Sequence, residues 1–252
     1  MSWGSCCAGV EARLRPYTQA MANATEHHVL RTGLRGTAGG MLLTLMAASL
    51  IDLGTSSALR LTDESPSHAV LLFQSVDLWV SPLALGSSAV ALVLWLMRSD
   101  RPFVRMFDLS LLLALVALVV NVAGLVVSLF DPKDEPGFLL LSAGLVYVEN
   151  VAVFAAYYWR FDHTHHNLYA DGDERDYPGI LFPQGTLGFR SLKGWVPRYM
   201  DYFFLSFNTS STFGPTLPVP LRASIQLGMM LQVTIAMTVL LMLAARAVGM
   251  IG

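Results

Sequence analysis

Charged residues and cysteines are scarce in this chain, and both shortages narrow its class. Charged residues make up 13% of the 252 positions and hydrophobic residues 54%, whereas soluble domains carry roughly 25% charged residues. This balance excludes an ordinary soluble domain and indicates an integral membrane protein. The two cysteines, Cys6 and Cys7, are adjacent. They are too close for an ordinary structural disulfide, and no second pair is present to form a framework.

Motifs that would assign a chemistry are also missing. The sequence contains no G-x-S-x-G, no H-E-x-x-H, no P-loop and no dinucleotide fingerprint, so we expect neither enzyme activity nor a cofactor. The formal net charge is -2, and no group of lysines and arginines points to nucleic acid, so no nucleic-acid partner is expected. The first 37 residues are polar and lack an apolar h-region, which predicts that no secretory signal is cleaved.

Long apolar runs take the place of these features. Each is a run of Leu, Val and Ala without the alternation of a strand, so helices are predicted. The predicted fold class is an all-α polytopic protein of the plasma membrane or bacterial inner membrane, with the lipid bilayer as a partner. Five transmembrane helices are predicted, at 38–59, 68–97, 107–130, 137–160 and 221–249.

These runs divide the chain into four parts. Because the connections between the first four runs are short, one membrane domain accounts for them, and no internal repeat is apparent. The predicted parts are a polar N-terminal tail (1–37), a four-helix transmembrane region (38–160), a linker (161–197) and a C-terminal unit (198–252).

Arginine and lysine are concentrated in alternate connections, which predicts the orientation. Cytoplasmic loops carry an excess of these residues. The N-terminus, the connection between the second and third helices, and the linker are therefore predicted to be cytoplasmic, and the C-terminus outside. The residues in these segments are Arg13, Arg15, Arg31, Arg35, Arg98, Arg101, Arg105, Arg160, Arg175, Arg190, Lys193 and Arg198.

The C-terminal unit begins with an apolar piece that is too short to cross a membrane. Residues 202–207 lead into a hydroxyl-rich turn and a Gly/Pro segment at 208–220, and only then into a long apolar helix. Non-helical backbone at membrane depth is tolerated where protein or a water-filled cavity surrounds it. We therefore predict a re-entrant helix and loop. The loop either lines an aqueous pathway or bonds its hydroxyls to neighbouring backbone as a structural element.

The run 204–220, FLSFNTSSTFGPTLPVP, resembles the pore helix and filter of tetrameric potassium channels, whose pattern is Y-F-S-F-x-T-x-x-T-x-G-Y-G-D-x-x-P. Uncharacterised prokaryotic potassium-channel-like membrane proteins with altered filters are similar as well. The resemblance covers about a fifth of the chain. It implies a pore helix, a filter whose backbone carbonyls bind a small ion, most simply a cation, and an inner helix at 221–248. It also implies a homo-oligomer, with a tetramer favoured.

The resemblance assigns pore residues by register. Thr209 matches the pore-helix threonine, and Thr212, Phe213 and Gly214 match the filter. Pro215 and Thr216 replace the Tyr-Gly that follows in the family, so the second filter glycine is absent and a filter other than the four-site potassium filter is expected. The predicted pore set is Thr209, Thr212, Phe213, Gly214, Pro215 and Thr216.

Polar residues inside the predicted spans form a second candidate site. A charged side chain at the centre of a bilayer costs roughly 2.5–3.5 kcal/mol on insertion scales, so such residues are functional candidates. They indicate a cation or proton site, or else protonated carboxyl groups hydrogen-bonded to neighbours. A proton- or metal-coupled transporter is thus an alternative function, and a non-conducting accessory protein is a third. The residues are Asp52, Asp77, Asn121, Glu149 and Asn150.

Three histidines follow the fourth predicted span. His163, His165 and His166 come directly after Asp162. Neutral imidazoles near a carboxylate can bind Zn, Ni or Cu, and histidines can also sense pH. A solvated group of histidines at the membrane interface is the alternative interpretation.

Overall fold

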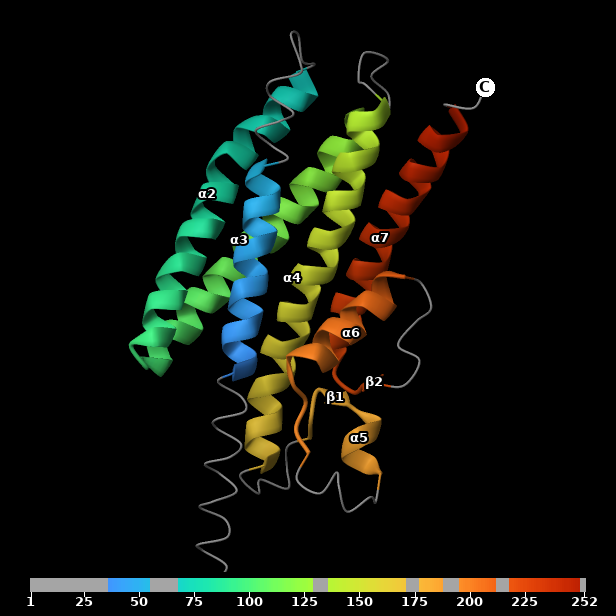
Figure 1. Cartoon of the computed structure of the whole chain (residues 1–252). Helices are drawn as coiled ribbons and strands as arrows, with labels where there is room; N and C mark the ends of the chain where they lie inside the picture. Colours follow the sequence, from blue (N-terminus) through green and yellow to red (C-terminus); the bar gives the residue numbers. More distant parts are fainter. Residues whose placement is uncertain are drawn as a thin grey trace, which may run out of the picture.

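The computed structural model describes residues 36–54, 68–128, 136–170, 177–187, 195–211 and 218–249. Five helices in this part are long and apolar enough to cross a membrane, which confirms the predicted all-α polytopic membrane protein. They run side by side along one long axis (Figure 1). Their bounds are Gly36–Gly54 for the first helix, His68–Leu96 for α2, Asp100–Ser128 for α3, Pro136–Ala170 for α4 and Ala223–Gly249 for α7.

The helix ends agree with the predicted spans for α2 and α7 but differ elsewhere. Helix α3 begins at Asp100, seven residues before the predicted start at 107. Helix α4 continues to Ala170, ten residues beyond the predicted end at 160, so the linker predicted from 161 begins after Ala170. The physical reason is that hydropathy marks where the apolar segment ends, whereas a helix ends where its backbone hydrogen bonding ends.

Helix α4 is the centre of the bundle. Residues 151–156 are buried on all sides, as expected of a helix packed against several others. Aromatic rings pack around its C-terminal half. Phe107 of α3 meets Trp159 edge to face, with 5.0 Å between the ring centroids, and the ring centroids of Phe154 and Tyr158 are 6.1 Å apart.

Helix α6, Tyr199–Ser210, is much shorter than its neighbours. Its first turn is closed by Asp201, whose carboxylate accepts a hydrogen bond from the Arg198 backbone N–H at 2.7 Å. Twelve residues at 1.5 Å each give a length of about 18 Å. The helix lies beside α4 and α7 and reaches only part of the way along them (Figure 1).

A small structured region lies at the end of the bundle where α6 and α7 begin (Figure 1). It contains β1 (Ile180–Leu181), the short helix α5 (Pro183–Thr186) and β2 (Val219–Pro220). The two strands are antiparallel, with Ile180 opposite Pro220 and Leu181 opposite Val219. Since β2 comes directly before α7, this pairing connects the segment after α4 to the start of the last helix.

Candidate functional site

A buried polar seam joins α6 to α7. The Gln232 side chain of α7 is fully buried, and its Nε2 lies within hydrogen-bonding distance of three acceptors on α6. These are the Ser206 carbonyl oxygen at 2.9 Å, the Ser206 Oγ at 2.8 Å and the Ser210 Oγ at 2.6 Å. A polar group buried this deeply needs such partners. Gln232 therefore fixes the position of α6 against α7.

Helix α4 completes the seam from the other side. The Tyr158 hydroxyl donates to Gln232 Oε1, and the Ser206 hydroxyl donates to the Val151 carbonyl at 2.7 Å. Asn150 Nδ2 donates to Ser210 Oγ at 3.3 Å. Asn150 lies near the middle of the span Leu140–His163, and Gln232 lies near the middle of Ala223–Ala245. The last turn of α6 is consequently level with the middle of both neighbouring spans.

The opposite end of α6 is held by a buried carboxylate. Asp162 of α4 accepts the Tyr202 hydroxyl on Oδ2 at 2.7 Å and the Ile180 backbone N–H on Oδ1 at 2.9 Å. Burial, together with the charge of Asp162, raises the pKa of the Tyr202 phenol well above its ordinary value. Tyr202 therefore stays a neutral donor at physiological pH. Through these two hydrogen bonds, Asp162 links the C-terminal part of α4 to the start of α6 and to β1.

A second polar group lies between the first helix, α3 and α4. Asn121 Nδ2 donates to Asp52 Oδ1 at 2.5 Å and to Glu149 Oε2 at 3.2 Å. Asp52 and Glu149 are both buried. Charged side chains are costly inside membrane spans, so two carboxyl groups that share one amide form a candidate site for a proton or a cation. The structure therefore brings together three of the five predicted intramembrane residues.

The other two predicted intramembrane residues do not join this group in the described structure. Asn150 points to the α6 seam instead, and its Oδ1 accepts no hydrogen bond there. Asp77 belongs to α2, but its side chain lies outside the described residues. Tyr147, a possible partner for the carboxyl groups, instead contacts Ser211 Oγ through its hydroxyl at 3.3 Å.

The predicted pore residues fall largely outside the described structure. Thr212, Phe213, Gly214, Pro215 and Thr216 lie between the described segments 195–211 and 218–249. Thr209 is buried, and its hydroxyl donates to the Leu205 carbonyl of its own helix at 2.8 Å. The described hydroxyls of α6 therefore bond to protein groups within the protomer. This arrangement agrees with the alternative in which the hydroxyl groups have a structural role.

The histidines lie on helix rather than in a loop. His163 stacks on Trp159, with 5.1 Å between ring centroids. The side chains of His165 and His166 are outside the described part. Among the described residues, no group of three or more His, Cys, Asp or Glu is placed to hold a metal ion. Metal binding by these histidines stays a prediction from the sequence.

Sequence reasoning missed the contacts that organise α6, and it named Asp162 only as a carboxylate beside the histidines. Gln232, Tyr158, Asp162 and Tyr202 carry the contacts that place this helix. Gln232 had a readable signal, because a single amide in a long apolar helix must find a hydrogen-bond partner. The two tyrosines had none, since tyrosine is common at the ends of apolar helices.

Comparison with known proteins assigns neither a family nor a function to this chain. No protein-family model, curated protein or solved structure matches this chain.

Proposed function

We propose that copies of this chain assemble into a membrane pathway for a small cation, in which α4, α6 and α7 of each copy form a pore-type module. The observation that carries the proposal is the short helix α6, held between two spans with its last turn near their middle. A bilayer core is roughly 30 Å thick, so a helix of about 18 Å that ends at this depth is re-entrant.

The electrostatics of α6 favour a cation. The carbonyl end of a helix carries about half a negative charge, and half-helices use this end to face cations in membrane proteins. The Ser211 backbone N–H donates to the Phe207 carbonyl at 3.0 Å, which closes the last turn. The segment 212–216, which follows in the sequence, is thereby the proposed place of ion contact, whereas the buried hydroxyls of α6 serve as its support.

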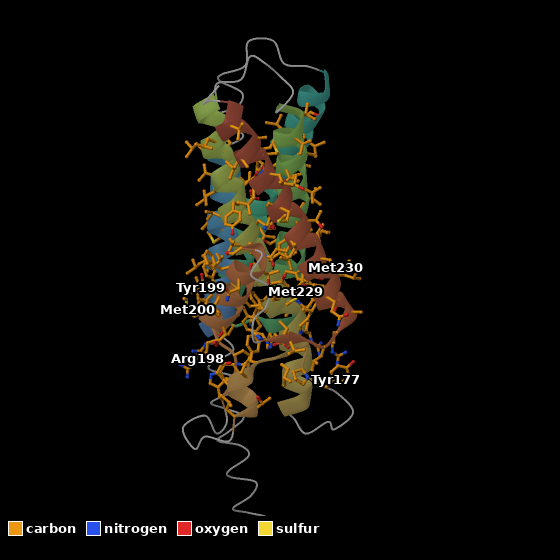
Figure 2. All side chains as sticks on the ribbon, turned by 90° about the vertical axis from the view of Figure 1, so that its right-hand side faces the viewer. Tyr177, Arg198, Tyr199, Met200, Met229 and Met230 are labelled. Atoms are coloured by element: carbon orange, nitrogen blue, oxygen red, sulfur yellow. The ribbon has the colours of Figure 1, made fainter. Side chains whose placement is uncertain are left out.

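The outward face of α6 favours an oligomer. Phe204 and Phe207 are 56% and 50% exposed in the single chain, and Met200 is exposed one turn earlier. Figure 2 shows Met200 at the lower part of α6, beside Tyr199 and Arg198. Irregular backbone in the hydrocarbon layer requires protein or water around it. Further copies of the chain would cover this face and place their re-entrant segments around one axis, with about four copies favoured by the resemblance.

Assembly is the first arm of the test. Mass measurement in mild detergent should give an oligomer, and Phe204→Cys should form disulfide-linked dimers after Cys6 and Cys7 are replaced by serine. Leu112→Cys is the matched control, because Leu112 is equally exposed but lies on α3. A monomer, or cross-linking through Leu112→Cys alone, would reject an axial pore.

Ion flux is the second arm. In liposomes, wild type should conduct potassium, sodium or protons, and Gly214→Val should abolish or alter this flux because a β-branched residue restricts the backbone there. Gly185→Val, at an exposed position of α5, should conduct like wild type. Folded wild type that conducts none of these ions at several pH values and voltages would favour the accessory-protein alternative.

The Asp52, Asn121 and Glu149 group supports a second candidate, a proton- or cation-coupled transporter within each protomer. Its specific observation is the amide shared by two buried carboxyl groups. In the same liposomes, Glu149→Gln separates the candidates. Loss of flux with Glu149→Gln, combined with normal flux in Gly214→Val, would select the transporter, and the reverse pattern would select the pore.

A further inference from the structure

The turn between α2 and α3 has the backbone of a glycine-terminated helix, but an arginine occupies the glycine position. The Arg98 N–H donates to the Trp95 carbonyl at 3.2 Å, and the Ser99 N–H donates to the Leu94 carbonyl at 3.1 Å. This pair of bonds is the usual closure in which the residue after the helix is left-handed. Arg98 has a φ of 60°.

Arginine at this position has a conformational cost that glycine would avoid. In the described part of the chain, Arg98 is the one non-glycine residue with positive φ. A residue held in a sparsely populated conformation points to a use for its side chain. Arginine at this position gives the turn an exposed positive charge, which glycine would not provide.

Two more arginines extend this charge along α3. Arg101 and Arg105 are exposed and lie four residues apart, on one face of the helix. Within the described structure, the side chains of these two arginines and of Arg98 make no hydrogen bond or ion pair. Asp108, further along α3, is already bound by Arg160 through two contacts of 2.5 and 2.9 Å. Counting Asp100, the segment 97–105 keeps a formal charge of +2.

Exposed apolar residues neighbour these arginines in the sequence. Met97 and Leu96 are 71% and 64% exposed, and Val104 is exposed between Arg101 and Arg105. The turn joins the ends of two candidate spans, Leu78–Leu96 and Arg101–Val127. It lies at the tip of the α2 and α3 pair, apart from α6 and α7 (Figure 1). Positive charge beside apolar groups at the end of a span is the chemistry of the lipid headgroup layer.

We propose that Arg98, Arg101 and Arg105 bind the phosphate of anionic phospholipids in the leaflet at this end of the bundle. Charge complementarity identifies the partner, because guanidinium groups are well suited to phosphate and the exposed Leu96 and Met97 match its acyl chains. A free anion would gain nothing from the apolar neighbours. The site is independent of the proposed pathway, since it uses neither α6 nor α7.

Thermal unfolding of the purified full chain tests this site. Wild type in detergent is titrated with phosphatidylglycerol, with phosphatidylcholine of the same acyl chains, and with soluble glycerol phosphate. Phosphatidylglycerol should raise the melting temperature most. Each of Arg98→Gln, Arg101→Gln and Arg105→Gln should weaken its apparent affinity about fivefold. A response to glycerol phosphate equal to that for phosphatidylglycerol would overturn the lipid assignment.

Arg98→Gly separates lipid binding from folding. Glycine suits the left-handed turn, so this variant should melt at or above the wild-type temperature in phosphatidylcholine and still lose about fivefold in phosphatidylglycerol affinity. Arg198→Gln is the charge-matched control at another exposed arginine and should bind like wild type. Wild-type affinity in the triple glutamine variant, or an equal loss in Arg198→Gln, would overturn the proposal.

Discussion

The polar residues of this bundle form two separate clusters, and α4 contributes one side chain to each. Glu149 and Asn150 are adjacent on α4, yet Glu149 meets Asn121 and Asn150 meets Ser210. Neighbouring residues on a helix point about 100° apart, so one helix supplies polar groups to two separate clusters. The sequence predicted both residues as candidates. It could not assign them to different partners, because that depends on which helices pack on each side of α4.

Gln232 is the residue whose loss should affect α6 most directly. Gln232→Leu would leave the Tyr158 hydroxyl and the Ser210 Oγ with fewer partners in a fully buried place. Leaving a buried polar group unsatisfied costs about 1–3 kcal/mol. We expect a destabilisation of at least that size, measured by thermal unfolding in detergent.

Gln226 provides the matched control for that measurement. It lies on the same helix, is exposed, and its side chain donates a hydrogen bond to the Pro220 carbonyl at 3.2 Å. Gln226→Leu should change stability by less than about 1 kcal/mol. Equal losses in the two variants would mean that the seam does not hold α6.

At the scale of elements, hydropathy predicted the existence of every long helix but not every end. The apolar runs predicted α2 and α7 nearly to the residue, because Arg98 follows α2 two residues after its end and Arg222 directly precedes α7. Helix α4 outlasts its apolar run, and its extra turns carry Asp162, which binds β1 and α6. A carboxylate that appears solvated in the sequence thus becomes a buried junction. That change depends on a strand pairing between residues about forty positions apart.

Close packing between α4 and α7 depends on a missing side chain. A side chain at position 228 would overlap the ring of Tyr157, whose hydroxyl donates to the Ser224 carbonyl at 2.9 Å. Gly228→Ala should therefore push α7 from α4 and cost about 1–3 kcal/mol, as overpacking does. Thermal unfolding in detergent measures the loss.

Gly86 of α2 is the control for this effect. Apart from its own helix backbone and its chain neighbours, no atom of the described structure lies within 4 Å of the position that a Cβ would take there. Alanine inside a helix is favoured over glycine by about 0.5–1 kcal/mol, so Gly86→Ala should be neutral or stabilising. The two glycine substitutions are thus expected to have opposite signs. A neutral Gly228→Ala would show that α4 and α7 can move apart at no cost.

For the whole molecule, the distribution of arginine carries most of the information about orientation. Arg98 and Arg101 lie at the α2 and α3 turn, and Arg198 and Arg222 lie beside the starts of α6 and α7. Figure 1 shows that α6 and α7 begin toward the end of the bundle that holds the α2 and α3 turn. Sequence and structure therefore agree that these charges share one end. Which compartment this end faces follows from the positive-inside rule and is a prediction.

Cysteine labelling tests that orientation at two exposed positions. These are Thr186 in α5 and Gly137 in the first turn of α4. In a background with Cys6 and Cys7 replaced by serine, Thr186→Cys should react with an impermeant thiol reagent only after cytoplasmic exposure. Gly137→Cys, at the other end of α4, should react from outside in intact cells. Under the proposed function, this pattern means that α6 enters the bilayer from the cytoplasm, opposite to the pore loop of potassium channels. Reversed labelling would place the arginine-rich end outside, against the positive-inside rule, and would restore the ordinary channel direction for α6.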